Sequence, residues 1–428
     1  MLPIKLFMGR EKSGGIVLIL SVTLAMILAN SNIAESYFHF FEQKVGFIVN
    51  GEPYLNCSLH HWINDGLMAM FFFVVGLELK REFIGGELAD IRNTILPIGA
   101  AVGGMIVPAL IFLSLNIGTP QTMGWGIPMA TDIAFALGVV YLLGDKVPVS
   151  AKVFLTTLAI VDDLGAVLVI AFFYTSELSI ASLLFGLCFL AVMFIGNRLG
   201  IKSLFFYAAL GIGGVWVTFL LSGIHATIAA VLAAFMIPAD AKINESVYLK
   251  RMKKLTRRFE KEEPNEVRTL EEGQVDVLTH IQHDTEIAIP LLQQLEHKMS
   301  PIVTFLIMPI FAIANAGISF TDLSLSDIFS THVALGVTLG LLLGKPIGII
   351  GATFLMVKMR WATLPSAITR RTLLGLGMLA SIGFTMSMFI STLAFTDELL
   401  MTQAKLGIFL ASILGGIGGY VLLNKKSK

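Results

Sequence analysis

Long apolar runs constrain this chain more than any other feature of its sequence. Stretches of about 20 mostly apolar residues, enough to span a bilayer, recur from one end to the other. Only 14% of the residues are charged, against about 25% in an average soluble domain. We therefore predict an all-α integral membrane protein with about twelve spanning helices, near residues 13–31, 62–82, 93–116, 121–144, 150–174, 178–197, 203–221, 223–238, 299–317, 330–355, 372–394 and 402–424.

The basic residues are distributed very unevenly about these helices. Twelve helices place both termini on one side of the membrane, and Lys and Arg favour the cytoplasmic side. With cytoplasmic termini, all but three of the 30 Lys and Arg residues fall in cytoplasmic segments or at cytoplasmic helix ends. Lys44 and Lys405 fall outside, and Lys345 falls within the membrane. This distribution supports the predicted topology as a whole.

A short polar segment, GFIVNGEPYLN at 46–56, contains Asn50-Gly51 between two strand-like runs. Asn-Gly is a strong signal for a two-residue hairpin turn. We expect a small external β-hairpin here, and an unstructured loop is the alternative. The exposed edges of such a hairpin could pair with a second copy of the chain.

Residues 240–298 form the only strongly charged stretch, and they include the basic run LKRMKKLTRRFEKEEP at 249–264. This run could form an amphipathic helix on anionic lipid, or it could be a solvated, partly disordered insert. The chain then divides into membrane helices at 1–239, a charged cytoplasmic insert at 240–298 and further membrane helices at 299–428.

Two adjacent aspartates, Asp162 and Asp163, lie in the middle of the apolar segment LAIVDDLGAVLVI. Ionisable groups at membrane depth are costly and usually functional. Adjacent helical residues point about 100° apart, so both side chains avoid lipid only beside a polar cavity. Two close carboxylates repel each other, and their oxygens suit protons or a small hard cation. The alternative is a purely structural ion pair or polar contact between helices.

Two predicted helices carry signs of a break. Asp132 follows Pro128 and Thr131, and Gly383 lies between Ser381 and Thr385. Interrupted helices in corresponding halves of a transporter mark its binding site. There Asp132 would offset the positive N-terminal ends of the broken helices.

Other charges admit a functional and a structural interpretation. Lys345 lies mid-helix in LLLGKPIGII and needs a counter-charge, for which Asp132, Asp162 and Asp163 are candidates, unless it reaches an interface. Glu78, Arg81 and Glu82 resemble an ordinary charged helix end. His225 resembles an interface histidine with its hydrogen bonds satisfied.

Together these segments resemble the NhaA-type sodium/proton antiporters over nearly the whole chain. The resemblance is carried, in order, by NDGLMAMFFFVVGLELKRE at 64–82, ATDIAFALGV at 130–139, VDDLGAV at 161–167, SGIHATIA at 222–229, FAIANAG at 311–317, LLGKPIG at 342–348 and SIGFTMSMF at 381–389. The insert at 240–298 looks longer than in typical relatives.

The resemblance implies a fold and a set of roles. It implies inverted-topology repeats of helices three to five and ten to twelve, two discontinuous crossing helices, a homodimer joined through the hairpin, and a bacterial inner-membrane location. It implies pH-regulated, electrogenic exchange of Na⁺ or Li⁺ for H⁺. The residues it assigns to ion and proton binding are Asp162, Asp163, Asp132, Thr131 and Lys345, with Na⁺ at the two adjacent aspartates. Those it assigns to pH sensing are Glu78, Arg81, Glu82, His225, Glu296 and His297, with Gly383 at a helix break also tied to pH response.

Other function classes fit the sequence less well. An intramembrane aspartyl protease needs facing carboxylates from two helices, whereas Asp162 and Asp163 are adjacent on one. No GxxxxGK[ST] loop is present, which argues against an ATP-driven pump. A cation channel or an organic-solute transporter remains an alternative. We expect a secondary transporter rather than an enzyme, without cofactor or nucleic-acid partner.

Overall fold

A computed structural model describes residues 11–49, 52–89, 91–175, 179–223, 225–261, 269–320 and 332–424. Within these residues, eight helices are long and apolar enough to cross a membrane, and the number rises to ten if each of two bent helix pairs is one span. The eight are Leu59–Gly85, Thr94–Asn116, Pro120–Lys146, Val149–Phe173, Ile180–Arg198, Leu291–Asn315, His332–Lys358 and Glu398–Asn424. The multi-pass membrane class is therefore confirmed, while the count of twelve stays a prediction.

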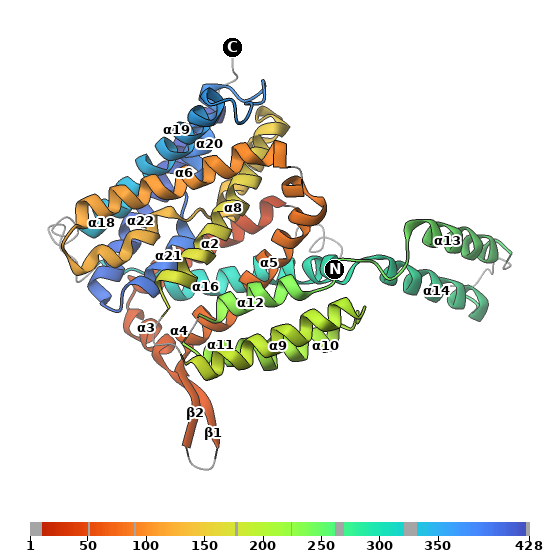
Figure 1. The fold of residues 1–428 in the computed structure, drawn as a ribbon. Helices are drawn as coiled ribbons and strands as arrows, with labels where there is room; N and C mark the ends of the chain where they lie inside the picture. Colours follow the sequence, from red (N-terminus) through yellow and green to blue (C-terminus); the bar gives the residue numbers. More distant parts are fainter. Residues whose placement is uncertain are drawn as a thin grey trace.

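The α-helices of the bundle are packed against one another over most of the chain (Figure 1). They are α2 (Glu11–Ala29), α3 (Ala34–Glu42), α4 (Leu59–His61), α5 (Met68–Gly85), α6 (Ile91–Asn116), α7 (Ile133–Leu143), α8 (Val149–Phe173), α9 (Ile180–Arg198), α10 (Leu204–Ala208), α11 (Val217–Leu220), α12 (Ala226–Met236), α15 (Leu291–Ile302), α16 (Met308–Asn315), α18 (His332–Leu339), α19 (Lys345–Lys358), α20 (Arg370–Ala380), α21 (Phe384–Ala394) and α22 (Glu398–Asn424).

Several spans contain turns that are not α-helical. Wider π-helical turns occupy Trp62–Leu67, Ala209–Trp216, Val303–Ile307 and Gly340–Gly344. Tighter 3₁₀ turns occupy Glu87–Ala89, Pro120–Met129 and Gly144–Lys146. π-turns inside helices are frequent at functional sites, and one of these ends immediately before Lys345.

One of the two bent helix pairs was predicted from the sequence, and the other was not. Helices α20 and α21 meet at 45° around Gly383, where the sequence predicted a break. Helices α2 and α3 meet at 111°, and α3 was not predicted. The aromatic residues of α3 explain its docking, because the ring of Tyr37 is buried and its hydroxyl donates a hydrogen bond to the Ile313 carbonyl.

The predicted hairpin is present as an antiparallel pair, β1 (Lys44–Val49) and β2 (Glu52–Ser58). Lys44 lies opposite Ser58, and Val49 lies opposite Glu52. The predicted Asn50-Gly51 turn lies outside the described residues. The indole nitrogen of Trp62 donates to the Val45 carbonyl at 2.9 Å and ties the hairpin to the first turn of its span. The pair projects from the lower end of the bundle in Figure 1.

The predicted insert at 240–298 contains α13 (Glu245–Phe259) and α14 (Glu272–Ala288), which pack side by side and extend away from the bundle (Figure 1). Its last residues belong to the next span, because α15 begins at Leu291 rather than at the predicted residue 299. Ion pairs of 3.0 Å join Arg251 to Asp284 and Arg258 to Asp276. The basic run is therefore helical as far as Phe259, and residues 262–268 lie outside the description.

Helices α6 and α19 approach each other closely, and α19 begins at Lys345. A Cβ atom added to Gly348 would lie 2.1 Å from the carbonyl oxygen of Gly103, and one added to Gly103 would lie 2.4 Å from that of Gly348. Only glycine permits this backbone contact, and small residues are the usual means of close helix packing in membranes. The contact fixes the depth at which Lys345 enters the bundle.

We expect Gly348→Ala to push α6 and α19 apart. Overpacking of this kind costs about 1–3 kcal/mol, so the unfolding temperature of the Gly348→Ala protein in detergent should fall by several degrees. Gly351→Ala is the matched control, because an added Cβ there meets no described atom within 4 Å. Equal unfolding temperatures for the two variants would contradict the close contact.

Candidate ion-binding site

The two helix breaks meet inside the bundle. The Asp132 amide donates to the Ile382 carbonyl at 2.7 Å, and the Thr131 hydroxyl donates to the Ala380 carbonyl at 2.9 Å. A third bond joins the Ser387 hydroxyl to the Ile127 carbonyl at 2.8 Å. Non-helical backbone at membrane depth is tolerated when its polar groups are satisfied by protein, and here each break satisfies the other.

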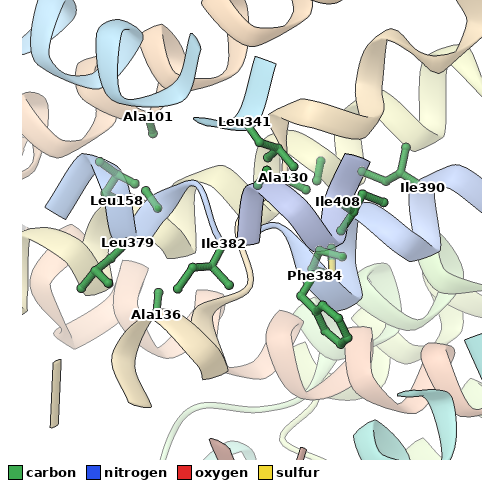
Figure 2. Close-up of a cluster of buried hydrophobic side chains, with 14 of the residues drawn as sticks. Ala101, Ala130, Ala136, Leu158, Leu341, Leu379, Ile382, Phe384, Ile390 and Ile408 are labelled. Atoms are coloured by element: carbon green, nitrogen blue, oxygen red, sulfur yellow. The ribbon is translucent and has the colours of Figure 1, made fainter. Parts of the chain in front are cut away.

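Apolar side chains surround this crossing. Figure 2 shows Ala130, Leu379, Ile382 and Phe384 packed about the two breaks, with Leu341 from the neighbouring span beside them. Gly383 itself has little room, because an added Cβ would lie 3.1 Å from the Ala130 carbonyl oxygen. The hydrogen bonds between the two helix breaks are therefore shielded from water, and polar groups at the crossing lie in a water-poor environment.

Asp132 is the acceptor for both helices that start at the crossing. Its carboxylate accepts from the Phe135 amide of α7 at 3.2 Å and from the Thr385 amide of α21 at 3.0 Å. The Thr385 hydroxyl donates to it as well. Asp132 therefore lies against the positive ends of two helix dipoles.

Lys345 pairs with Asp162. Its ammonium lies 2.6 Å from Asp162 Oδ2, also donates to the Met129 carbonyl, and is fully buried. The interface alternative is thus excluded, and of the three candidate counter-charges the structure selects one. The Met129 carbonyl is available because the chain leaves helical geometry at residues 130–132.

Asp163 has a different environment from its neighbour. The Oδ1 atoms of both aspartates are buried without a hydrogen-bond partner in the described chain, but Asp162 has Lys345 on its other oxygen. Asp163 lines a cavity of about 190 Å³ together with Asp132, Thr385 and Glu78. The wall of this cavity is built by α2, α5, α7, α8, α21 and the span that contains α15 and α16, and it includes both Asp163 and Glu78.

The oxygen atoms at this cavity suit a hard, singly charged cation. Asp163 supplies a carboxylate, and Thr385 supplies a hydroxyl on the same wall. No group of three or more His, Cys, Asp or Glu side chains in the described ranges could hold a metal ion. A cation bound here would be held by mixed carboxylate and hydroxyl oxygens, with Asp163 and Thr385 among the donors.

The cluster at the other end of the cavity joins α5 to α15. Arg81 lies 3.0 Å from both Glu82 and Glu296, and Glu82 is buried. Glu78 lies on the cavity wall one turn before Arg81. From the sequence, Glu78, Arg81 and Glu82 resembled an ordinary charged helix end. In the structure, Arg81 and Glu296 form a contact between two spans.

The remaining predicted residues lie apart from this cluster. His297 is exposed on α15. His225 precedes α12, and its Nε2 atom lies 2.7 Å from the Tyr174 carbonyl oxygen. His225 lies near Asp65. Asp65 and Glu78 are at opposite ends of the span Leu59–Gly85. Thr385 was not predicted from the sequence as a site residue, although it lies within the SIGFTMSMF segment.

Comparison with known proteins identifies the class. The Na⁺/H⁺ antiporter 1 family profile matches residues 5–423. The chain is 49% identical to the Na⁺/H⁺ antiporter NhaA 2 of Syntrophotalea carbinolica, over 99% of this chain and 97% of that protein. It is 47% identical to the Na⁺/H⁺ antiporter NhaA of Wolinella succinogenes (98% and 92% covered) and 47% identical to that of Helicobacter pylori strain 26695 (99% and 95%). The chain belongs to the Na⁺/H⁺ antiporter 1 family, and it is a transporter rather than an enzyme.

We expect Lys345→Met to destabilise the protein, because it leaves Asp162 buried without its counter-charge. Breaking one side of a buried pair typically costs about 3–5 kcal/mol, measurable as a lower unfolding temperature. The double variant Lys345→Met/Asp162→Asn removes both charges and should recover most of that loss without recovering transport. A double variant no more stable than the single one would argue against the pair.

Proposed function

We propose that the chain exchanges Na⁺ or Li⁺ for H⁺ electrogenically, with Asp163 as the carboxylate that meets the cation. Sodium/proton exchange is the activity of its family. The observation that carries the proposal for the site is the contrast between two adjacent aspartates. Asp162 is neutralised by Lys345, whereas Asp163 lies on the cavity wall and has no such ion pair among the described residues.

The exchange follows from charge balance in a water-poor site. A bare carboxylate at this depth is costly, so Asp163 holds either a proton or a cation. A cation bound at Asp163 lies beside Asp162 and competes with Lys345 for it. Once released, the Lys345 ammonium is a buried charge without a partner, and it gives up its proton. One Na⁺ then replaces two protons, one from Asp163 and one from Lys345, and a net charge moves.

Thr131 and Asp132 support this exchange from the crossing. Asp132 offsets the two helix N-termini, and the hydroxyl of Thr131 holds the breaks together. We propose that the crossing belongs to a fold of twelve spanning helices with inverted repeats of helices three to five and ten to twelve. In this arrangement both termini are cytoplasmic, the membrane is the bacterial inner membrane, and the role is sodium and pH homeostasis without a cofactor.

We propose that pH regulates exchange at the entrance to the cavity. Glu78, Arg81, Glu82 and Glu296 form a charged contact between two spans that line the cavity. A change in the protonation of these carboxylates changes the attraction between the spans and hence the width of the cavity. His297 on α15, His225 near Tyr174, and Gly383 at its break are further candidates for this response.

We also propose that the protein is a homodimer in the lipid bilayer. Strands β1 and β2 form an isolated pair, so each has an outer edge that is not covered by a third described strand. Such edges pair readily with another copy of the same strand. No nucleic-acid partner is proposed.

Asp163→Asn tests the site directly. It retains size and polarity but cannot ionise, so exchange and Na⁺ binding should be lost, by at least about 100-fold in rate if the carboxylate carries the cation. Exchange is measured in sealed proteoliposomes together with the membrane potential that the native protein should generate. Asp65→Asn is the matched control, because Asp65 also lies in a span but pairs with His61 outside the cavity. Full exchange in Asp163→Asn would refute the site, and exchange without a potential would refute the two-proton coupling.

Glu296→Gln tests pH regulation. The Glu296 carboxylate repels that of Glu78 and attracts Arg81. Its loss should move the pH profile of exchange to more acidic pH while the maximal rate stays within about twofold, because the ion site is untouched. Glu286→Gln is the control, since Glu286 makes only an exposed contact with Lys298 on the same side of the molecule. Superimposable profiles for native protein and Glu296→Gln would count against the cluster.

A further inference from the structure

A second polar contact joins the same two spans at their other ends. The first span runs from Leu59 to Gly85 and the second from Leu291 to Asn315, and the cavity lies between them. Arg81 and Glu296 link them at one end. At the opposite end, about 27 Å away along the first helix, His60, Asn64 and Asn315 form a closed ring of hydrogen bonds.

The ring has three members and three bonds. His60 Nε2 lies 3.0 Å from Asn315 Oδ1, Asn315 Nδ2 lies 2.9 Å from Asn64 Oδ1, and Asn64 Nδ2 lies 3.3 Å from His60 Nδ1. Asn315 is fully buried and Asn64 is buried, whereas His60 is half-buried and reachable from solvent. Buried amides without partners are costly, so the ring holds the two spans together at this end.

A neighbouring carbonyl fixes the direction of every bond in the ring. Asn315 Nδ2 also lies 3.1 Å from the Phe311 carbonyl oxygen, which can only accept. Asn315 therefore turns its oxygen toward His60 and its nitrogen toward Asn64. It follows that His60 must donate from Nε2 and accept at Nδ1, which only the neutral imidazole can do.

Protonation of His60 makes the ring impossible to close. The imidazolium has two donors and no acceptor, while each amide offers one donor and one acceptor to the ring. Three bonds then face four donors and two acceptors, so one bond always opposes two donors, whichever way the amides turn. We propose that His60, Asn64 and Asn315 form a proton-operated clamp, which holds the two cavity-lining spans together when His60 is neutral and releases them when it is protonated.

The other charged and titratable groups near His60 do not take its place in the hydrogen-bonded ring. His61 is occupied by Asp65, 3.1 Å away. Lys405 of α22 and His61 both act electrostatically on His60. The adjacent helix α3 contributes the exposed residues Glu35, His39 and Glu42 and the buried Tyr37, whose hydroxyl donates to Ile313. Lys405 is a cation, and it opposes protonation of His60 while the clamp is closed.

The consequence for exchange is a response to pH on one face only. Below about pH 6.5, where a free imidazole takes up a proton, each further pH unit weakens the clamp by up to about tenfold. Release at this end allows the spans to separate there, opposite the Glu78 end, and we expect this separation to speed exchange. His60, Asn64 and Asn315 are therefore positioning residues for the exchange, and this inference rests on the exchange activity proposed above.

The first test measures exchange in proteoliposomes of known orientation, with pH varied from 8 to 5 on one face at a time. His60→Gln keeps one donor and one acceptor but cannot be charged, so the ring closes at every pH. We expect the rate ratio between pH 5 and pH 8 on the His60 face to fall several-fold in this variant, with no change on the other face. His61→Gln is the matched control and should keep the native ratio. A native ratio in His60→Gln would overturn the clamp.

A second variant, Asn315→Asp, should reverse the effect of acid pH on the exchange rate. In Asn315→Asp the carboxylate supplies two acceptors, so a ring with protonated His60 has three donors and three acceptors and closes once the Asn64 amide turns over. The carboxylate oxygen nearest Phe311 then faces that carbonyl without a hydrogen bond whether or not the ring is closed, so this cost does not depend on pH. Acid pH on the His60 face should then slow exchange instead of speeding it. An unaltered acid response in Asn315→Asp would also overturn the clamp.

The third measurement needs no transport. Trp62 follows His60 closely and its ring lies 6.5 Å from that of Trp216. Its emission in detergent should change between pH 8 and pH 5 in the native protein and in His61→Gln, but not in His60→Gln, with Trp62→Phe identifying the signal. No native transition would refute the clamp. A transition lost only in His60→Gln, in a protein without exchange, would leave the clamp standing and refute the exchange site instead.

Discussion

The buried ammonium of Lys345 is the constraint on which the rest of the site depends. A charge at that depth requires a counter-charge and further acceptors, and it finds them in Asp162 and the Met129 carbonyl. That carbonyl is free because residues 130–132 are not helical, and this break persists because the break at 381–383 satisfies its polar groups. The depth of Lys345 is fixed in turn by the glycine contact between α6 and α19. The ion pair, the two breaks and the helix contact therefore form one interdependent arrangement.

Three aspartates in one membrane layer have three different environments. Asp132 is surrounded by N–H and O–H donors, Asp162 by an ammonium, and Asp163 by a cavity and apolar side chains. Carboxyl groups held in contrasting environments take different roles. The same site can therefore contain one permanent helix cap, one ion pair and one exchangeable position, all built from the same residue type.

The sequence predicted the class of fold and the members of the site better than their partners. Apolar runs identified the membrane spans, and Asn-Gly between two strand-like runs identified the hairpin strands. It left open which aspartate pairs with Lys345, because the rotation of one helix against another is set by side-chain packing that periodicity does not record. The same limit applies to Met129, whose role depends on a backbone carbonyl, and to α3, whose nine residues are too few to register as a span. The sequence also did not indicate that His225 and Glu78 lie far apart, because both were identified only as residues near helix ends.

The π-helical turn at Gly340–Gly344 has a geometrical consequence for α19. A π-turn contains one more residue than the α-turn it replaces, and one residue corresponds to about 100° of rotation around a helix axis. The turn ends at Gly344, directly before Lys345. The extra residue therefore sets the side of the helix from which the Lys345 side chain leaves, so that a continuous α-helix from His332 would direct the ammonium away from Asp162.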